Sequence, residues 1–417
     1  MHHYSNQNAK NTSCHICSHI INSFMNFGRM PIANGFLEEE EFHSEYFFDM
    51  EVALCDNCKM FQLVNQPEPE QMFNENYAFF SGTSKLMANH FKDFSNHVMD
   101  DYLKDKYNPF VVEIGSNDGI MLKNFAQKGI RHLGIEPSAN VARVAMDQGI
   151  NTIVEFFDKS LAERIVSEHG QADAYIAANV MCHIPNINSI VEGIKVLLKS
   201  DGIVIFEDPY LGNVIEKTTY DQIYDEHTFL FSIHSIQYLF NQYDMEVIDV
   251  EPQESHGGSI RYVVSHKGER QVNDIVLSQL EYEKKIGLTE LETFYEFKNN
   301  CEKSKSDLII LLEQLRVEGK SVVGYAATSK STTIINFCGI NNKLLKCIYD
   351  TTPIKQGKFS PGAHIPILNH KIFKDNYPDY ALLFAYNHER EIMAKEEEFL
   401  AQGGKWITYV PHLRIIE

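Results

Sequence analysis

Four cysteines near the N-terminus form two identical pairs. Cys14 and Cys17 make one Cys-x-x-Cys pair, and Cys55 and Cys58 make the second. Each pair can present two thiolates to one ion, and two pairs complete the tetrahedron that zinc prefers. Because four protein ligands leave no open coordination position, the pattern predicts a structural zinc site. Few long apolar runs surround the pairs, so the metal is expected to supply much of this segment's folding energy.

Other interpretations of the cysteines remain open. A redox dithiol would explain one pair but not two, and an iron–sulfur cluster would use the same ligands. His15 or His19 could replace one thiolate. The other four cysteines show no pairing pattern, and we expect them to be buried, reduced thiols: Cys182, Cys301, Cys338 and Cys347.

A glycine-containing loop in the middle of the chain could hold a cofactor. An apolar strand that ends at Glu113 runs into a loop with Gly115 and Gly119, and a helical pattern follows. Glycine lets the backbone pass close to a ligand and adopt positive φ. The next expected strand ends in Glu136, and a carboxylate there suits two vicinal ribose hydroxyls.

The type of cofactor depends on the middle of this loop. Asn117 occupies the place where a dinucleotide loop has the glycine that admits a pyrophosphate. A lone glycine loop could serve NAD or a flavin, but this one favours a cofactor without phosphates. The pattern resembles the first motifs of class I methyltransferases, which bind S-adenosylmethionine. The expected cofactor-binding residues are Glu113, Gly115, Asn117, Gly119, Glu136, Pro137 and Asn179.

The resemblance extends over nearly the whole chain, to the sugar C-methyltransferases that act on nucleotide-linked deoxysugars. It rests on the cysteine pairs, the loop above and five further motifs: Asn76–Gly82, Gly134–Ser138, Asp221–His227, His256–Arg261 and Gly324–Lys330, with 350–366 after them. In that family the typical substrate is a 4-keto-6-deoxy sugar nucleotide, which is methylated at C3. A carbon next to a ketone becomes nucleophilic only when it loses a proton, so such a site needs a base.

The resemblance also implies which residues act. The base of the family aligns with His227, Glu226 could orient its ring, and the Tyr224 hydroxyl could steady the enolate or share the proton transfer. Tyr77 and His183 align with active-site positions as well. The alternative for each residue is ordinary packing in the core or on the surface.

A second ligand-binding loop is expected near the C-terminus. Residues 321–325 predict a strand that enters a small-residue loop and a helix, and a helix N-terminus beside Lys330 suits a diphosphate. Thr328 and Ser329 stand where the family often has Pro and Ala, so the preferred nucleotide base stays open. The expected substrate-binding residues are Ser81, His256, Ser259, Thr328, Ser329, Lys330, Asp350 and Lys355.

The elements that must position these residues belong to an α/β protein. Alternating strand and helix patterns predict a class I methyltransferase Rossmann-like domain with a zinc module before it and a Rossmann-like α/β domain after it. The expected parts of the 417-residue chain are a zinc-binding module at 1–66, the methyltransferase domain at 67–267, a helical connection at 268–318 and the nucleotide-sugar domain at 319–417.

The composition limits the partners. A net charge of −20 argues against a nucleic acid polymer, whose phosphates select for an excess of Lys and Arg. No apolar run approaches the roughly 20 residues of a membrane helix, and the polar N-terminus lacks the plan of a signal peptide. We therefore expect a cytoplasmic protein, and the family resemblance implies that it is an enzyme that takes a nucleotide-linked keto-deoxysugar. An O- or N-methyltransferase and a non-catalytic scaffold remain alternatives.

Overall fold

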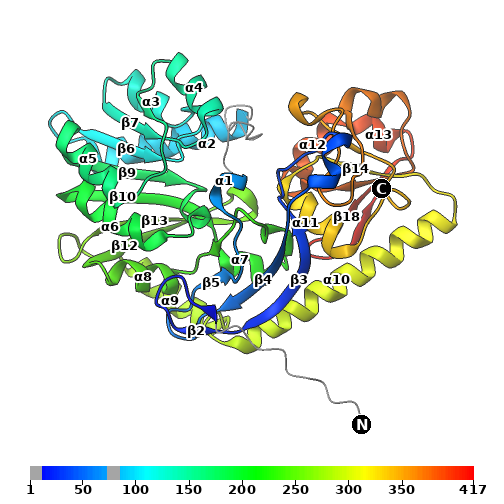
Figure 1. Ribbon diagram of the computed structural model, residues 1–417, viewed down its shortest axis with the longest axis horizontal. Helices are drawn as coiled ribbons and strands as arrows, with labels where there is room; N and C mark the ends of the chain where they lie inside the picture. The colour runs from blue at the N-terminus through cyan, green and yellow to red at the C-terminus, as the bar shows by residue number, and fades with distance from the viewer. Residues whose placement is uncertain (1–11, 73–84) are drawn as a thin grey trace, which may run out of the picture.

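The computed structural model describes residues 12–72 and 85–417, so the predicted residues Tyr77 and Ser81 lie outside the described part. The larger α/β sheet and a second α/β sheet stand on opposite sides of the molecule, with the N-terminal strands between and below them (Figure 1). The long helix α10 (Leu291–Val317) runs along the base beneath the second sheet (Figure 1).

The cysteine pairs belong to a small antiparallel sheet. A two-stranded hairpin, β1 (Thr12–Ser13) and β2 (Ile20–Ile21), encloses the first pair. The four-stranded sheet has the order β11-β5-β4-β3. Its strands are β3 (Ser23–Pro31), β4 (Phe47–Leu54), β5 (Phe61–Leu63) and β11 (Phe229–Leu230). Because β11 comes from the middle of the chain, the N-terminal segment does not complete this sheet by itself.

The central sheet has seven strands in the order β12-β13-β10-β9-β6-β7-β8. Six of them run in the same direction, and β13 runs antiparallel to them between β10 and β12. This arrangement confirms the expected class I methyltransferase sheet. The strands are β6 (Phe110–Ile114), β7 (Arg131–Ile135), β8 (Thr152–Ile153), β9 (Ala172–Ala178), β10 (Leu198–Pro209), β12 (Met245–Gln253) and β13 (Ser259–His266). The turn η6 (Ser255–Gly257) before β13 contains His256, of which only the backbone is described.

Helices cover both faces of the central sheet because its strands present apolar side chains on both sides. Val112 and Ile114 of β6 belong to one hydrophobic cluster, whereas Val111 belongs to another. The helices of this region are α1 (Pro69–Met72), α2 (Lys85–His97), α3 (Leu122–Gln127), α4 (Ala139–Asp147), α5 (Lys159–His169), α6 (Ile187–Leu197), α7 (Leu211–Glu216) and α8 (Ile233–Asn241).

The C-terminal sheet has the order β16-β15-β14-β17-β18-β19. The first five strands are parallel, and their order, 3-2-1-4-5 when counted along the chain, is that of the first five strands of a Rossmann fold. They form the Rossmann-like domain that the sequence predicted. The strands are β14 (Val322–Tyr325), β15 (Ile348–Asp350), β16 (Ile367–Asn369), β17 (Tyr380–Leu383), β18 (Lys405–Thr408) and β19 (Arg414–Ile416). The helices are α11 (Ser329–Cys338), α12 (Glu389–Lys395) and α13 (Glu397–Ala401).

Two helices connect the α/β sheets, α9 (Asp274–Lys285) and α10, in the region where the sequence predicted a helical connection. α10 buries one apolar stripe against the neighbouring elements. Its buried residues are Phe294, Phe297, Cys301, Leu308, Leu312 and Leu315. Among the described residues, no helix has both the length and the apolar character needed to cross a bilayer.

Candidate functional site

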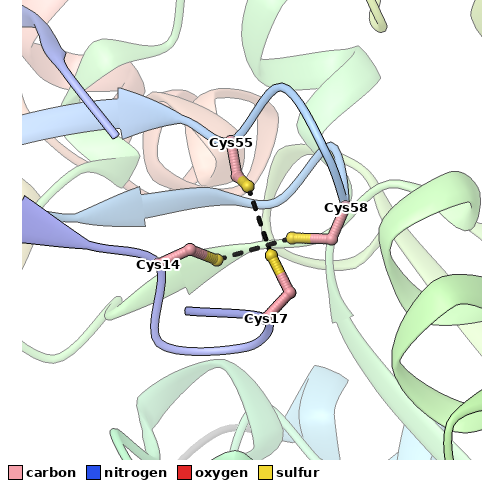
Figure 2. A group of neighbouring side chains, drawn as sticks. All are labelled: Cys14, Cys17, Cys55 and Cys58. Carbon is pink, nitrogen blue, oxygen red and sulfur yellow. Dashed lines mark hydrogen bonds between the residues drawn. The ribbon is translucent and has the colours of Figure 1, made fainter. Parts of the chain in front are cut away.

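The four N-terminal thiols converge on one point between the two Cys-x-x-Cys turns (Figure 2). The sulfurs of Cys14 and Cys58 lie 3.5 Å apart, as do those of Cys17 and Cys55, and all four lie within 4.8 Å of one another. A tetrahedral zinc ion with Zn–S bonds of about 2.3 Å holds its sulfurs about 3.8 Å apart. The thiols therefore fit a closed tetrahedral zinc site.

Both cysteine turns close with the same backbone geometry. Ser18 and Lys59 directly follow the second cysteine of each pair and have φ values of 58° and 57°. Their N–H groups donate to the carbonyl oxygens of Cys14 and Cys55, over 2.9 and 2.8 Å. The buried Gln62 amide donates to the Cys14 sulfur over 3.1 Å, a contact of the kind that orients a metal ligand. In the described chain, neither nearby histidine belongs to this ligand group.

The zinc-bearing segment also has apolar packing that the sequence analysis underestimated. Phe24, Met50, Val52 and Leu63 are buried, and they join the hydrophobic cluster that extends into both α/β sheets. Each such side chain stabilises the fold by about 1.5–3 kcal/mol. This apolar packing therefore adds to the folding energy that is expected from the metal.

A cavity of about 660 Å³ lies at the carboxyl ends of the central parallel strands, where open α/β sheets bind their ligands. Its wall combines Asn34, which follows β3, with the loops of the central sheet and the start of α11. It brings together most of the predicted site residues: Gly115, Asn117, Glu136, Pro137, Asn179, His183, Tyr224, Glu226, His227, Thr328, Ser329 and Lys330.

The loop after β6 needs glycine at two places. Gly115 has a φ of 58°, and a Cβ there would lie 2.3 Å from a methyl carbon of Val180. Gly119 has a φ of 78°, and its Cβ would lie 3.0 Å from Ile150. Asn117 also has a left-handed φ, of 48°, which asparagine tolerates better than most residues. The loop can therefore approach a ligand closely.

Glu136 directly follows β7 and holds this loop in place. One carboxylate oxygen accepts from the Asn117 N–H over 3.0 Å, and the other accepts from the Ser138 N–H over 2.8 Å. Burial raises the pKa of Glu136, and these two backbone hydrogen bonds oppose the rise. Each oxygen keeps a further lone pair, so the carboxylate can still accept from a ribose diol. In the same wall, Asn179 Oδ1 has no hydrogen-bond partner among the described residues. These acceptors fit an adenosyl cofactor that bears an ammonium group.

The sequence analysis missed two residues at this end of the cavity. Phe156 and Asp158 follow the short strand β8 and line the wall. Phe156 is 46% exposed, and an exposed ring of this kind suits a purine base. Asp158 caps α5 by accepting from the Leu161 N–H over 2.8 Å. Their position after the third parallel strand was the signal that could have found them.

His227 and Tyr224 form a hydrogen-bonded pair in the cavity wall. His227 Nδ1 lies 2.6 Å from the carbonyl oxygen of Gln222, so Nδ1 carries the proton. Nε2 is then the acceptor, and the Tyr224 hydroxyl donates to it over 2.7 Å. Burial raises the pKa of Tyr224 well above its usual range, and the nearby charge of Glu226 adds to the rise. In this arrangement Tyr224 keeps its proton and His227 offers the basic lone pair.

Two other predicted residues adjoin this pair. The His183 ring stacks on the His227 ring with a centroid distance of 5.2 Å and an interplanar angle of 24°. Glu226 lines the cavity, and its Oε1 accepts from the Asn34 side chain over 2.5 Å. The role of Glu226 in orienting the histidine ring stays a prediction. The Gln222 carbonyl, which was not predicted, holds that ring by its hydrogen bond to Nδ1.

Two buried acidic residues near the end of β10 lie behind the residues that line the cavity. Glu207 pairs with His90 over 2.8 Å and with Arg261 over 3.0 Å, and these partners outweigh burial and lower its pKa. Asp208 accepts from the Cys182 N–H over 3.5 Å. Burial raises the pKa of Asp208 to about 7, so this carboxyl takes up a proton near neutral pH. Neither acid lines the cavity, and the sequence analysis singled out neither.

The far wall is the N-terminus of α11. The Thr328 hydroxyl oxygen accepts from the Ser331 N–H over 3.1 Å, and the Ser331 hydroxyl oxygen accepts from the Thr328 N–H over 3.0 Å. Burial lowers the pKa of Lys330, while the charge of Asp221 opposes that change. The Lys330 ammonium also lies 5.6 Å from the centre of the Tyr386 ring. A cation and a helix N-terminus thus face the cavity together.

The structure keeps some predicted residues out of the cavity wall: Glu113, Gly119, Ser259, Asp350 and Lys355. Asp350 accepts from the Ala327 N–H over 2.7 Å, and Lys355 donates to the Ala327 carbonyl over 2.8 Å, so both fix the loop before α11. Ser259 is buried at the start of β13. Burial raises the pKa of Glu113 well above its usual range, and the nearby Asp118 and Glu136 charges add to the rise.

Family models match three successive parts of the chain. A zinc binding domain model matches residues 14–73, a methyltransferase domain model matches 88–250, and a C-methyltransferase C-terminal domain model matches 254–411. C-methyltransferase NovU of Streptomyces niveus is 32% identical over 407 residues, which cover 97% of this chain and 96% of that protein. The chain belongs to the C-methyltransferase family. It is therefore an S-adenosylmethionine-dependent C-methyltransferase with a structural zinc site.

More distant relatives match only the central region. Ubiquinone biosynthesis O-methyltransferase of Acinetobacter baylyi is 30% identical over 99 residues, 23% of this chain and 42% of that protein. Among solved structures, PH0226 protein of Pyrococcus horikoshii aligns with a TM-score of 0.35 at 15% identity, over 49% of this chain and all of that chain. Neither of these two partial similarities bears on the substrate.

Replacing Glu136 tests the cofactor site of this C-methyltransferase. Glu136→Ala removes an acceptor for the ribose hydroxyls and also frees the Asn117 N–H of the loop. Since a hydrogen bond to a charged group contributes about 1.5–3 kcal/mol, S-adenosylmethionine binding should weaken by about tenfold or more. Titration calorimetry measures this, with Glu163→Ala on the exposed face of α5 as the control. Unchanged affinity would show that Glu136 does not contact the cofactor. Tight binding of NADH would contradict the assignment of S-adenosylmethionine as the cofactor.

Proposed function

We propose that this enzyme methylates C3 of a nucleotide-linked 4-keto-6-deoxy sugar. The observation that carries the proposal is the Tyr224–His227 pair, which faces the same cavity as the cofactor loop and the start of α11. A methyl donor, a base and an anion-binding element meet there. Methylation of a carbon beside a ketone needs the methyl donor and the base. Binding of a nucleotide sugar needs the anion-binding element.

The base is required because a carbon next to a carbonyl is a poor nucleophile until it is deprotonated. The C3–H bond breaks, its electron pair delocalises onto the C4 oxygen, and the proton passes to His227 Nε2 directly or by way of the Tyr224 oxygen. In the relay the Tyr224 hydroxyl gives its own hydrogen to Nε2, takes up the C3 proton, and can then donate that hydrogen to the enolate oxygen. When bound, S-adenosylmethionine supplies an electrophilic methyl group on a sulfonium. No further activation of the donor is needed.

The orientation of His227 supports its role as the final proton acceptor. Because Nδ1–H is held by the Gln222 carbonyl, Nε2 stays unprotonated and points at Tyr224. The stacked His183 ring limits rotation of the imidazole. A base that is already in the correct tautomer loses little rotational freedom when the substrate binds.

The start of α11 supports a diphosphate as the anchor of the sugar. The helix is ten residues long, its first turn lines the cavity, and Lys330 adds a half-buried cation there. The N–H groups and dipole at a helix N-terminus favour an anion. This positive site is local, because the chain as a whole has a net charge of −20.

Hydrogen exchange tests the proposal against O- and N-methylation. The enzyme is incubated in deuterated buffer with a 4-keto-6-deoxy sugar nucleotide and S-adenosylhomocysteine, which cannot donate a methyl group. We expect deuterium at C3 by NMR, and a C3-methyl product once S-adenosylmethionine replaces the analogue. Methylation without exchange would favour an oxygen or nitrogen acceptor. Tight cofactor binding without exchange or turnover on such sugars would favour a scaffold.

A further inference from the structure

The zinc-bearing segment reaches the catalytic cavity through one short loop. The Ala33 N–H donates to Asp225 Oδ1 over 2.9 Å, and the Asn34 side-chain amide donates to Glu226 Oε1 over 2.5 Å. The Ala33 carbonyl accepts from the Thr332 hydroxyl of α11 over 2.9 Å. The dipeptide after β3 therefore donates one hydrogen bond to each of two neighbouring carboxyl groups, and it is itself held by the C-terminal lobe.

Only one of these two buried carboxyl groups ionises readily, because a charge on one opposes ionisation of the other. Asp225 and Glu226 are 1% and 3% exposed. Burial raises the pKa of Asp225 well above its usual range, and the Glu226 charge raises it further. Other charged or titratable groups that interact with Glu226 include Tyr224, the Cys182 thiol and the Lys355 ammonium. Since two adjacent buried carboxyls do not both ionise easily, Asp225 keeps its proton and Glu226 has the charge.

We propose that Asn34 is a positioning residue for methyl transfer, because its amide holds Glu226 ionised in the cavity wall beside the Tyr224–His227 pair. The negative charge of Glu226 keeps the proton on Tyr224 and stabilises the imidazolium that forms when His227 accepts the substrate proton. The N-terminal segment then contributes to catalysis as well as to the fold. This inference rests on the proposed function for the substrate used in its kinetic test.

Asn34→Asp tests this role with almost no change of shape. The substitution replaces the amide donor with a third carboxylate, which should raise the pKa of Glu226 by repulsion. Because the ionised form of Glu226 is the active one, the acidic limb of the kcat profile should move to higher pH by about one unit or more. At neutral pH, kcat should fall by about tenfold or more, while the Kd for S-adenosylmethionine stays within about twofold.

Asn26→Asp is a matched control within the same strand region. Asn26 also donates its amide to a glutamate, Glu51 Oε1, over 3.1 Å, but this pair is exposed on β3 and β4 and far from the cavity wall. The kcat and the pH profile of Asn26→Asp should match those of the wild type. Asn34→Ala removes the donor without adding a charge, so its kcat should fall while its profile shifts less. This second variant keeps the inference testable if Asn34→Asp does not fold.

A carboxyl titration separates this inference from the choice of substrate. The protein is labelled with ¹³C at the glutamate side-chain carboxyl, and the Glu226 signal is assigned as the one absent from Glu226→Gln. Asn34→Asp should raise the midpoint of that signal without any substrate present, and Asn26→Asp should not. The inference would be overturned if Asn34→Asp had the wild-type titration midpoint for Glu226, the wild-type kcat and the wild-type pH profile. It would also be overturned if the variant lost zinc and cofactor binding to the same extent as it lost activity. If the wild type turned over no keto sugar, the proposed function would fail and the titration would still decide the role of Asn34.

Discussion

His227→Asn is expected to lower turnover by about 100- to 10,000-fold, the usual contribution of a positioned base. The asparagine amide can still donate to the Gln222 carbonyl, so the loop that contains Tyr224 should keep its shape. It offers no basic nitrogen to the Tyr224 hydroxyl, so the C3 proton has no acceptor. Binding of S-adenosylmethionine and of the sugar nucleotide should change little, and steady-state kinetics with calorimetry separates the two effects.

Hydrogen exchange at C3 makes this prediction specific. Exchange needs deprotonation but no methyl transfer, so it should fall together with turnover in His227→Asn. His132→Asn is a suitable control because His132 Nδ1 also contacts a backbone carbonyl, over 3.0 Å, but the residue lies outside the cavity wall. If turnover collapsed while exchange persisted, His227 would position the donor and Tyr224 would be the base. If neither changed, His227 would be a packing residue.

The cofactor end of the site could be predicted because its determinants are local in the sequence. Gly115 and Asn117 stand in one loop, and Glu136 follows the next strand, so their spacing predicted that they meet in one cavity wall. Parallel strands bring their carboxyl ends to one edge, which placed Asn179 beside them. Zinc ligands were also local, since each turn contains both cysteines of its pair.

The remaining part of the site depends on contacts that no local pattern encodes. Asn34 and Glu226 are 192 positions apart, and nothing in the spacing of either residue points to the other. Asp350 and Lys355 have the charges of ligand-binding residues, but they bond to the backbone of the loop before α11. Gln222 acts through its carbonyl group, which every residue has, so its side-chain type gave no signal.

The two cysteine turns are also tied to the methyltransferase lobe. The Asn188 amide of α6 donates to the carbonyl oxygens of His15 and Ile16, over 3.1 and 3.0 Å. The strand β11, which begins two residues after His227, pairs with β5 beside the second turn. Backbone contacts therefore connect the zinc site to the segment that contains the proposed base, so a disordered zinc site should disturb that segment.

Cys55→Ser should consequently lose both the metal and much of the activity. A serine hydroxyl is a poor replacement for a thiolate, and a structural Cys₄ zinc site contributes an apparent binding free energy of about 10–16 kcal/mol. The wild type should contain about one zinc per chain after dialysis by elemental analysis. The variant should contain almost none. Hydrogen exchange of backbone amides should rise in residues 12–66 first, because the apolar core next to them is retained.

Cys301→Ser distinguishes loss of zinc from the cost of burying a hydroxyl. Cys301 lies on α10 and is 0% exposed, as Cys55 is, but it stands outside the thiol cluster. The control should keep its zinc and the protection of residues 12–66, even if its melting temperature falls. Full metal retention in Cys55→Ser would contradict the four-cysteine site. Loss of zinc with wild-type turnover would show that order in the cysteine turns does not reach the cavity, although β11 joins them to the segment of His227.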